Sequence, residues 1–280
     1  MKRKYGSFVL SMAMIMSLLC GCSATQQKVT PESLLKDVQA ASSQLKSVNS
    51  EMEMNYDLEV ESNGFKIPLE VLLEMDCDFI MEPAQAKIDL SLNLNMFGNN
   101  EEQSMEMYFI DKDGEMLAAI YDGNTWDSIS LDSSELDELK RTFNQDYSTL
   151  FDMSTLKLEQ TDVTIDDQSV YLLKGKVNTD IIKNATNIIE EDSIPFDYEG
   201  QMIDCEFYIY KDSKLPARIV LDMDKLLTDL MKKSLALESE ENVNIIVNQC
   251  LFTIDYTDIN EIKEIRIPSD AFQNHEVVDF

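Results

Sequence analysis

The sequence predicts an α+β fold: a long curved antiparallel β-sheet (a half-barrel) with helices packed on its concave apolar face. Apolar and polar residues alternate strictly along 51–60, 67–79 and 84–96, which is the period of a sheet with one buried face. The Asn63-Gly64 pair between the first two segments favours a two-residue hairpin. Strands of about 13 residues would span roughly 43 Å at about 3.3 Å per residue, so the sheet should twist and curl.

Two turns set the register of these three segments. A hairpin at Asn63-Gly64 and a turn at Glu82-Pro83 pair apolar residues with apolar residues throughout, whereas a slip of one residue would reverse every side chain. The inward face is rich in methionine, which suits either a cavity that adapts to varied chains or ordinary core packing. The inward residues that would line such a cavity and bind an apolar ligand are Met52, Met54, Tyr56, Val71, Leu73, Met75, Leu90, Leu92 and Leu94.

The outward face of the same strands carries like charges in direct opposition. The register places Glu51 opposite Asp76 and Glu53 opposite Glu74, where carboxylates destabilise each other. These pairs are either solvated and screened or bind divalent cations loosely.

The remaining elements follow from their apolar periodicity. A first helix should begin with Thr30 as N-cap and Pro31 as its first residue, and its apolar stripe continues to Val48. Helices with such apolar stripes would cover the concave face of the sheet. Because no linker segment interrupts the sequence, residues 30–280 are predicted to form a single domain. Further helices are expected within 133–151 and at 179–190 and 224–236, and further strands at 103–110, 115–121, 125–131, 155–165, 169–177, 200–210, 215–223 and 244–257.

The N-terminus has the pattern of an export signal. Lys2, Arg3 and Lys4 precede an apolar run that is too short for an ordinary transmembrane helix. The run ends in Leu19-Cys-Gly-Cys22, which resembles the lipobox of bacterial lipoproteins, with Cys22 as the thiol that receives diacylglycerol. We therefore expect a signal peptide at 1–21 and a lipidated tether at 22–29, which would anchor the protein to the outer face of the cell membrane.

Composition and motifs argue against nucleic-acid binding and against catalysis. The formal net charge of −30 at pH 7 repels phosphate groups. The sole histidine, His275, lies in the C-terminal tail, and neither a nucleophile-elbow motif nor a phosphate-binding loop is present. We expect no catalytic residue, no metal and no cofactor.

Three cysteines remain in the body of the chain. Cys77, Cys205 and Cys250 each fall in phase with apolar neighbours at two-residue spacing. They are either buried free thiols that act as small hydrophobic residues, or two of them form a disulfide.

Taken along its length, the chain resembles the LppX/LprG-like lipoproteins, whose fold is related to that of the LolA/LolB lipoprotein carriers. The resemblance rests on the lipobox, the Thr30-Pro31 helix start, the strand-turn-strand at 207–220 with its Leu-Pro pair, and a closing segment at 265–271. It implies a half-barrel with helices closing its concave side, and a cavity in which characterised members carry lipids or lipoproteins. It implies no catalytic residues.

Two functions follow as hypotheses. The first is binding or carrying a lipid or other apolar ligand at the outer membrane face, in a cavity between sheet and helices. The second is a non-enzymatic acidic interaction or sensor module that docks a protein partner. A continuous cavity between sheet and helices would favour the first, and a solid core the second.

The lipid on Cys22 is the only anchor that the sequence indicates. Cys22→Ser is therefore expected to move the protein from the membrane fraction to the soluble fraction, as measured by fractionation and immunoblotting. If the variant remains with membranes after a high-salt wash, the lipobox interpretation is wrong or a second anchor exists.

Overall fold

The computed structural model describes residues 29–62, 64–112, 115–131, 147–159, 162–179, 201–238 and 243–272. The chain divides into two compact units, Met1–Thr30 and Pro31–Phe280, and all helices and strands below belong to the second. Cys22, His275, most of the predicted helix at 179–190 and most of that within 133–151 lie outside the described residues.

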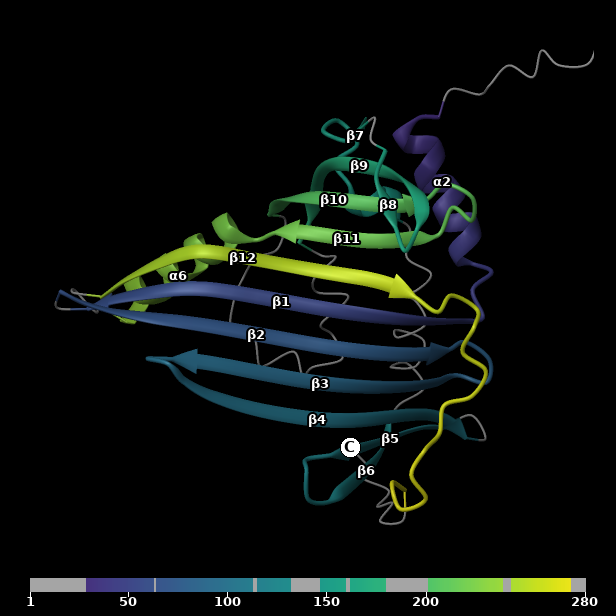
Figure 1. The fold of residues 1–280 in the computed structure, drawn as a ribbon, viewed down its shortest axis with the longest axis horizontal. Coiled ribbons are helices and arrows are strands. Elements are labelled where there is room, and N and C mark those ends of the chain that lie inside the picture. The colour runs from purple at the N-terminus through teal and green to yellow at the C-terminus, as the bar shows by residue number, and fades with distance from the viewer. Residues whose placement is uncertain are drawn as a thin grey trace, which may run out of the picture. The chain divides into compact units, whose positions relative to one another are not determined.

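An antiparallel sheet of 12 strands dominates the second unit. The strands are β1 Ser47–Ser62, β2 Phe65–Ile80, β3 Gln85–Met96, β4 Asn99–Lys112, β5 Glu115–Tyr121, β6 Trp126–Leu131, β7 Lys157–Glu159, β8 Thr164–Ile165, β9 Gln168–Asn178, β10 Met202–Tyr210, β11 Pro216–Asp222 and β12 Val243–Thr257. Their order is β6-β5-β4-β3-β2-β1-β12-β11-β10-β9-β7, and β8 pairs with β9 (Figure 1). The path ends at β6 and at β7, so the sheet is open. The predicted antiparallel sheet is confirmed, except that the expected strand at 155–165 is two short strands.

The predicted register of the first three strands is confirmed. Met52 lies opposite Met75 and Tyr56 opposite Val71 between β1 and β2, and Leu73 lies opposite Leu92 between β2 and β3. Ser62 pairs with Phe65 across the first hairpin. The alternation of apolar and polar residues therefore sorts side chains onto two faces of the sheet.

The connection between β3 and β4 differs from the prediction. We expected the fourth strand to begin at 103, but β4 begins at Asn99, directly after a two-residue turn at Phe97-Gly98 that pairs Met96 with Asn99. Both turn residues have positive φ, 55° for Phe97 and 77° for Gly98. Asparagine or glycine usually occupies such positions, and a phenylalanine there strains the backbone. This unfavourable residue is why the turn was not predicted.

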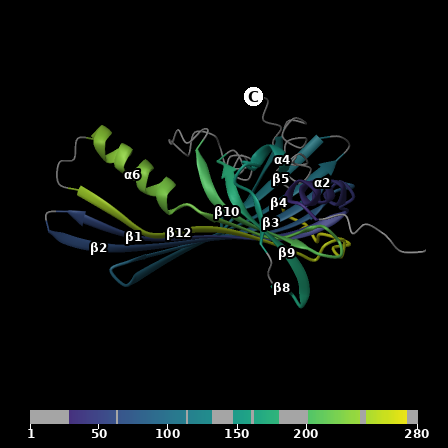
Figure 2. The ribbon, with the colours of Figure 1, turned by 90° about the horizontal axis from the view of Figure 1, so that it is seen from above.

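The helices among the described residues lie on one side of the sheet (Figure 2). They are α2 Pro31–Ser42, the short α4 Tyr147–Leu150 and α6 Asp224–Glu238. The predicted start of α2 and the prediction of α6 are confirmed. The extension of the first helix to Val48 is wrong, because Val48 lies in β1. After Ser42 the amides of Gln44 and Leu45 bond to carbonyls three residues back, at 3.0 and 3.1 Å, a tightening that ends the helix.

Buried hydrophobic residues of the described chain form two large clusters and a smaller one around Val170, Tyr210 and Ala217. The first joins α2, α4 and α6 to inward residues of β9–β12, and Tyr147 stacks on Phe207 with 5.4 Å between ring centroids. At its N-terminus α6 is tied to β12, because the Asp224 carboxylate accepts a hydrogen bond from the amide of Cys250. The second cluster lies where β2–β5 meet near the start of β1, and includes Val48, Phe79 and Phe109.

Relieving the strain at Phe97 should stabilise the fold. The side chain is 61% exposed, so Phe97→Asn gives up little packing while it removes a bulky residue from positive φ. We expect the free energy of unfolding to rise by about 1 kcal/mol, measured by urea denaturation. A loss of stability in this variant would mean that the Phe97 side chain packs on the protein.

Candidate functional site

The nine candidate ligand-binding residues form a regular array on the side of the sheet where the helices lie. Three strands contribute three residues each, and we call the array the apolar grid. Across β1, β2 and β3 its rows are Met52–Met75–Leu90, Met54–Leu73–Leu92 and Tyr56–Val71–Leu94. The structure therefore brings together all of the predicted positions.

Coverage of the apolar grid decreases from β1 toward β3. Met54 belongs to the first core cluster, in which Met52, Tyr56 and Leu73 are also packed, and Met75 packs on the second. Neither cluster includes the remaining members, which are half-buried: Val71, Leu90, Leu92 and Leu94. The β3 side of the grid is thus its most accessible part.

The apolar grid carries no charge. Its one polar group, the Tyr56 hydroxyl, donates a hydrogen bond to Met54 Sδ. Burial, together with the neighbouring Cys250 thiol, raises the pKa of Tyr56 to about 12, so the phenol stays neutral at pH 7. By their alternation, the inward positions of the described strands include no lysine, arginine or histidine.

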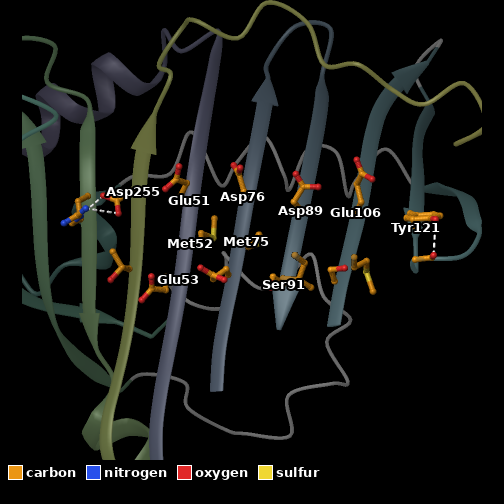
Figure 3. A pocket seen from close by; sticks show the side chains of 17 residues that line it. Glu51, Met52, Glu53, Met75, Asp76, Asp89, Ser91, Glu106, Tyr121 and Asp255 are labelled. Atoms are coloured by element: carbon orange, nitrogen blue, oxygen red, sulfur yellow. Dashed lines mark hydrogen bonds and ion pairs between the residues drawn. The ribbon is translucent and has the colours of Figure 1, made fainter. Parts of the chain in front are cut away.

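The outward face has a hollow of about 740 Å³ that is lined mostly by polar and acidic residues, and also by Met52, Met75 and Leu90 of the grid. Side chains of five adjacent strands line up across it, and we call them the carboxylate row: Asp255, Glu51, Asp76, Asp89 and Glu106 (Figure 3). The predicted opposition of Glu51 and Asp76 is confirmed and extends over β12, β3 and β4. Like charges at such positions destabilise a sheet.

Polar partners neutralise only part of the carboxylate row. Arg218 holds Asp255 through two hydrogen bonds of 2.5 and 3.0 Å, and this contact raises the pKa of the guanidinium. Lys87 bonds to Asp89 at 2.5 Å, and the Tyr108 hydroxyl donates to Glu106 at 2.6 Å. Within the described ranges, no group of three or more His, Cys, Asp or Glu is arranged to hold a metal ion. Glu51 and Asp76 are exposed and the other three members are half-buried, so the row forms an acidic surface.

An aromatic cluster lies at the β5–β6 end of the hollow. The Trp126 ring lies 5.0 Å from that of Tyr121 and 5.7 Å from that of Tyr108, measured between centroids. Tyr121 lies opposite Glu106, at the end of the carboxylate row. Sequence reasoning missed this cluster, because the register had been derived only for the first three strands.

The hollow on the outward face is not the cavity predicted between sheet and helices. Two of the helices expected to cover the apolar grid fall largely on 132–146 and 180–200, outside the described residues. The cavity on the helix side stays a prediction.

The three body cysteines are buried free thiols. Burial, together with nearby carboxylates, raises the pKa of Cys77 and of Cys250 to about 12, and burial likewise raises that of Cys205. Thiols that stay protonated at neutral pH are poor nucleophiles and poor metal ligands. The interpretation of these cysteines as small hydrophobic residues is confirmed.

The model of the DUF6612 family, described as a family of unknown function, matches residues 30–276. This chain belongs to the DUF6612 family. The DUF6612 match does not name the LppX/LprG-like lipoproteins, so that relationship stays a prediction. No curated protein matches the chain in sequence.

Two solved structures are similar to the DUF6612 chain. One is a DUF1329 family protein from Desulfovibrio piger ATCC 29098, with 10% identity, a TM-score of 0.23, and coverage of 86% of this chain and 95% of the other. The other is a β-barrel-like protein of the domain of unknown function DUF1849 from Brucella abortus, with 7% identity, a TM-score of 0.20, and coverage of 77% and 99%. Likenesses at these TM-scores say nothing about function.

No helix among those described is long and apolar enough to cross a membrane.

Removing one charge from the carboxylate row should stabilise the fold. Glu51 is exposed between Asp255 and Asp76, so Glu51→Gln is expected to raise the free energy of unfolding by about 0.5 kcal/mol at low salt. This increase in the free energy of unfolding should be smaller at high salt, because salt screens surface charges. Urea denaturation at two salt concentrations measures both effects.

Glu59→Gln is the matched control, on the same face of the same strand. Its carboxylate pairs with Lys66, so this variant should show no gain at low salt. Equal stabilisation of both variants would contradict the like-charge account of the row.

Proposed function

We propose that this DUF6612 protein is a lipid-anchored extracytoplasmic lipoprotein that binds or carries an uncharged lipid or similar apolar ligand over the apolar grid. The activity is binding, without catalysis. The observation that carries the proposal is the in-register array of apolar side chains, of which the β3 column belongs to neither core cluster. Covering such a surface stabilises a complex by about 25 cal/mol per Å² of apolar area buried.

The charge of the protein and of its inward face favours binding of an uncharged ligand over binding of an anionic one. The protein carries a formal charge of −30, and the inward positions of its described strands lack a basic side chain that could pair with a carboxylate or a phosphate. Glu101, opposite Leu94 at the β4 border of the grid, adds a negative charge on the same face. An anionic head group would meet repulsion here, whereas a neutral one would not.

We further propose that the ligand lies in a half-barrel cavity closed by helices. The resemblance of the lipobox and of short motifs to LppX/LprG-like lipoproteins supports this placement, as does the position of α2, α4 and α6 on the side of the grid. Anchoring through Cys22 would hold such a protein next to a source of lipid.

A second candidate is an acidic interaction module, for which the carboxylate row is the supporting observation. Glu51, Glu53 and Glu74 line the outward hollow, where a basic partner would be attracted. The carboxylates and the grid side chains belong to opposite faces of one sheet, so variants of Leu73 and Leu92, which do not line the hollow, leave the acidic face unchanged.

The binding test uses the soluble Cys22→Ser form and a fluorescent long-chain alcohol as an uncharged probe. The double variant Leu73→Gln, Leu92→Gln places two amides at the centre of the grid and is expected to abolish binding. Leu73→Met, Leu92→Met is the matched control, because it keeps the volume and apolar character and should keep binding. Circular dichroism checks that both variants fold.

The charge of the ligand gives an independent check. The fatty acid of the same chain length should bind at least about tenfold more weakly than the alcohol at pH 8 and low salt, and added salt should narrow the difference. A wild-type protein that ignores both probes, or a glutamine variant that binds as well as wild type, would overturn the proposed function.

A further inference from the structure

The apolar grid is bordered differently on each side. Toward α2 it meets the second core cluster, where Val48, Phe79 and Ile88 are buried. Toward β12 it meets Phe252 and Cys250, which are buried in the first. At these two borders packed side chains of the described strands leave no path by which a ligand could reach the grid.

Two of the three border positions on β4 are polar, and the third is Met105, which is 37% exposed. Gln103 and Glu101 lie opposite Leu92 and Leu94, and both are exposed. An apolar chain leaving over this edge would cross hydrated side chains, which is unfavourable.

Met105 continues the apolar surface by one residue onto β4, opposite Leu90. The longer continuation among the described residues follows the strands toward their hairpin ends. Beyond the grid, Leu58, Leu69 and Met96 form the next row, and Val60 and Ile67 the row after it. On the β1 and β2 side, Leu58 is 6% exposed and packs with Leu69 in the first core cluster, whereas on the β3 side Met96 is 44% exposed, and Phe65 at the end of the sheet is 76% exposed. The accessible path from the grid to solvent therefore runs along β3, through Leu94 and Met96.

The path ends at two hairpin turns that lie at the same end of the sheet, away from α2 (Figure 1). Phe65 follows the first turn, and Met96 and Phe97 lie at the second; we call these three residues the hairpin tips. Phe97 is 61% exposed although its backbone has a φ of 55°, a conformation that a bulky side chain disfavours. A residue kept in an unfavourable conformation, where it packs on little, points to a role other than stability.

We propose that the hairpin tips are the route by which the uncharged apolar ligand enters and leaves the apolar grid. This inference rests on the proposed function. The exposed apolar side chains offer the incoming chain its first contact, and the rows behind them lead it along the strands without crossing a polar group. The tips contact the ligand in transit, whereas the grid contacts it when bound.

A route differs from a binding site in its kinetics. Substitutions along an entry route change the free energy of the transition state for entry and exit, but not that of the bound state. The association and dissociation rates therefore change by the same factor. The double variant Phe65→Asn, Phe97→Asn should slow both rates by about tenfold and leave Kd within about twofold of the wild-type value. The measurement is stopped-flow fluorescence with the long-chain alcohol probe and the soluble Cys22→Ser form.

Two controls accompany the tip variant. Met202→Asn replaces another exposed apolar residue, 40% exposed on β10, and should leave both rates unchanged. Leu73→Gln, Leu92→Gln should abolish binding, since it alters the grid. Urea denaturation should show that the tip variant remains folded, because Asn at position 97 suits the turn.

The outcomes separate this inference from the proposed function. Unchanged rates in the tip variant, or a faster dissociation with a raised Kd, would overturn the route while leaving binding at the grid in place. The route would also be overturned if light scattering showed that the wild-type protein is a dimer and the tip variant a monomer. That result would identify the hairpin tips as a contact between two copies of the chain. Failure of the wild-type protein to bind the probe would overturn both.

Discussion

Cross-strand pairing of apolar side chains in β1, β2 and β3 is the constraint on which the rest of the structure depends. β1 pairs with β2 along its whole length and with β12 on its other side. Because side chains alternate between faces, the register that sets Tyr56 beside Val71 also sets Glu51 beside Asp76. The apolar grid and the carboxylate row are two results of one alignment, and neither can shift without the other.

The relative magnitudes explain why the sheet tolerates the carboxylate row. Burying one leucine-sized side chain contributes about 1.5–3 kcal/mol, whereas an opposed pair of exposed like charges costs at most about 1 kcal/mol. Arg218 and Lys87 offset part of that cost. The inward face therefore decides the register, and the outward face accepts the charges that follow from it.

Local turn chemistry made part of this arrangement predictable. Asn63-Gly64 specifies its own hairpin, and once it closes, alternation assigns every residue of β1 and β2 to a face. The start of β4 could not be predicted, because Phe97 is a poor residue for its turn and Asn99–Ser104 shows no apolar alternation. Val48 fits both a helical and a strand pattern, and only its place opposite Phe79 decides between them.

The full carboxylate row could not be predicted for a different reason. Asp255 joins the row through the pairing of β1 with β12, and no short turn encodes this pairing. The pairing also contains an irregularity between Asp57 and Leu58, which changes the alignment along the strand. Long-range pairing depends on the whole fold, so sequence periodicity alone identifies the strands but not their neighbours.

The position of β12 has a consequence for how the protein folds. β1 follows the first described helix, yet its second partner, β12, is the last of the described strands. The residues that β12 adds to the core include Cys250, Phe252 and Ile254. Contacts between distant parts of a chain form slowly, because a large loop must close first. A growing or truncated chain that ends before β12 leaves the hydrogen-bonding edge of β1 unsatisfied, and such an edge readily pairs with another molecule and starts aggregation.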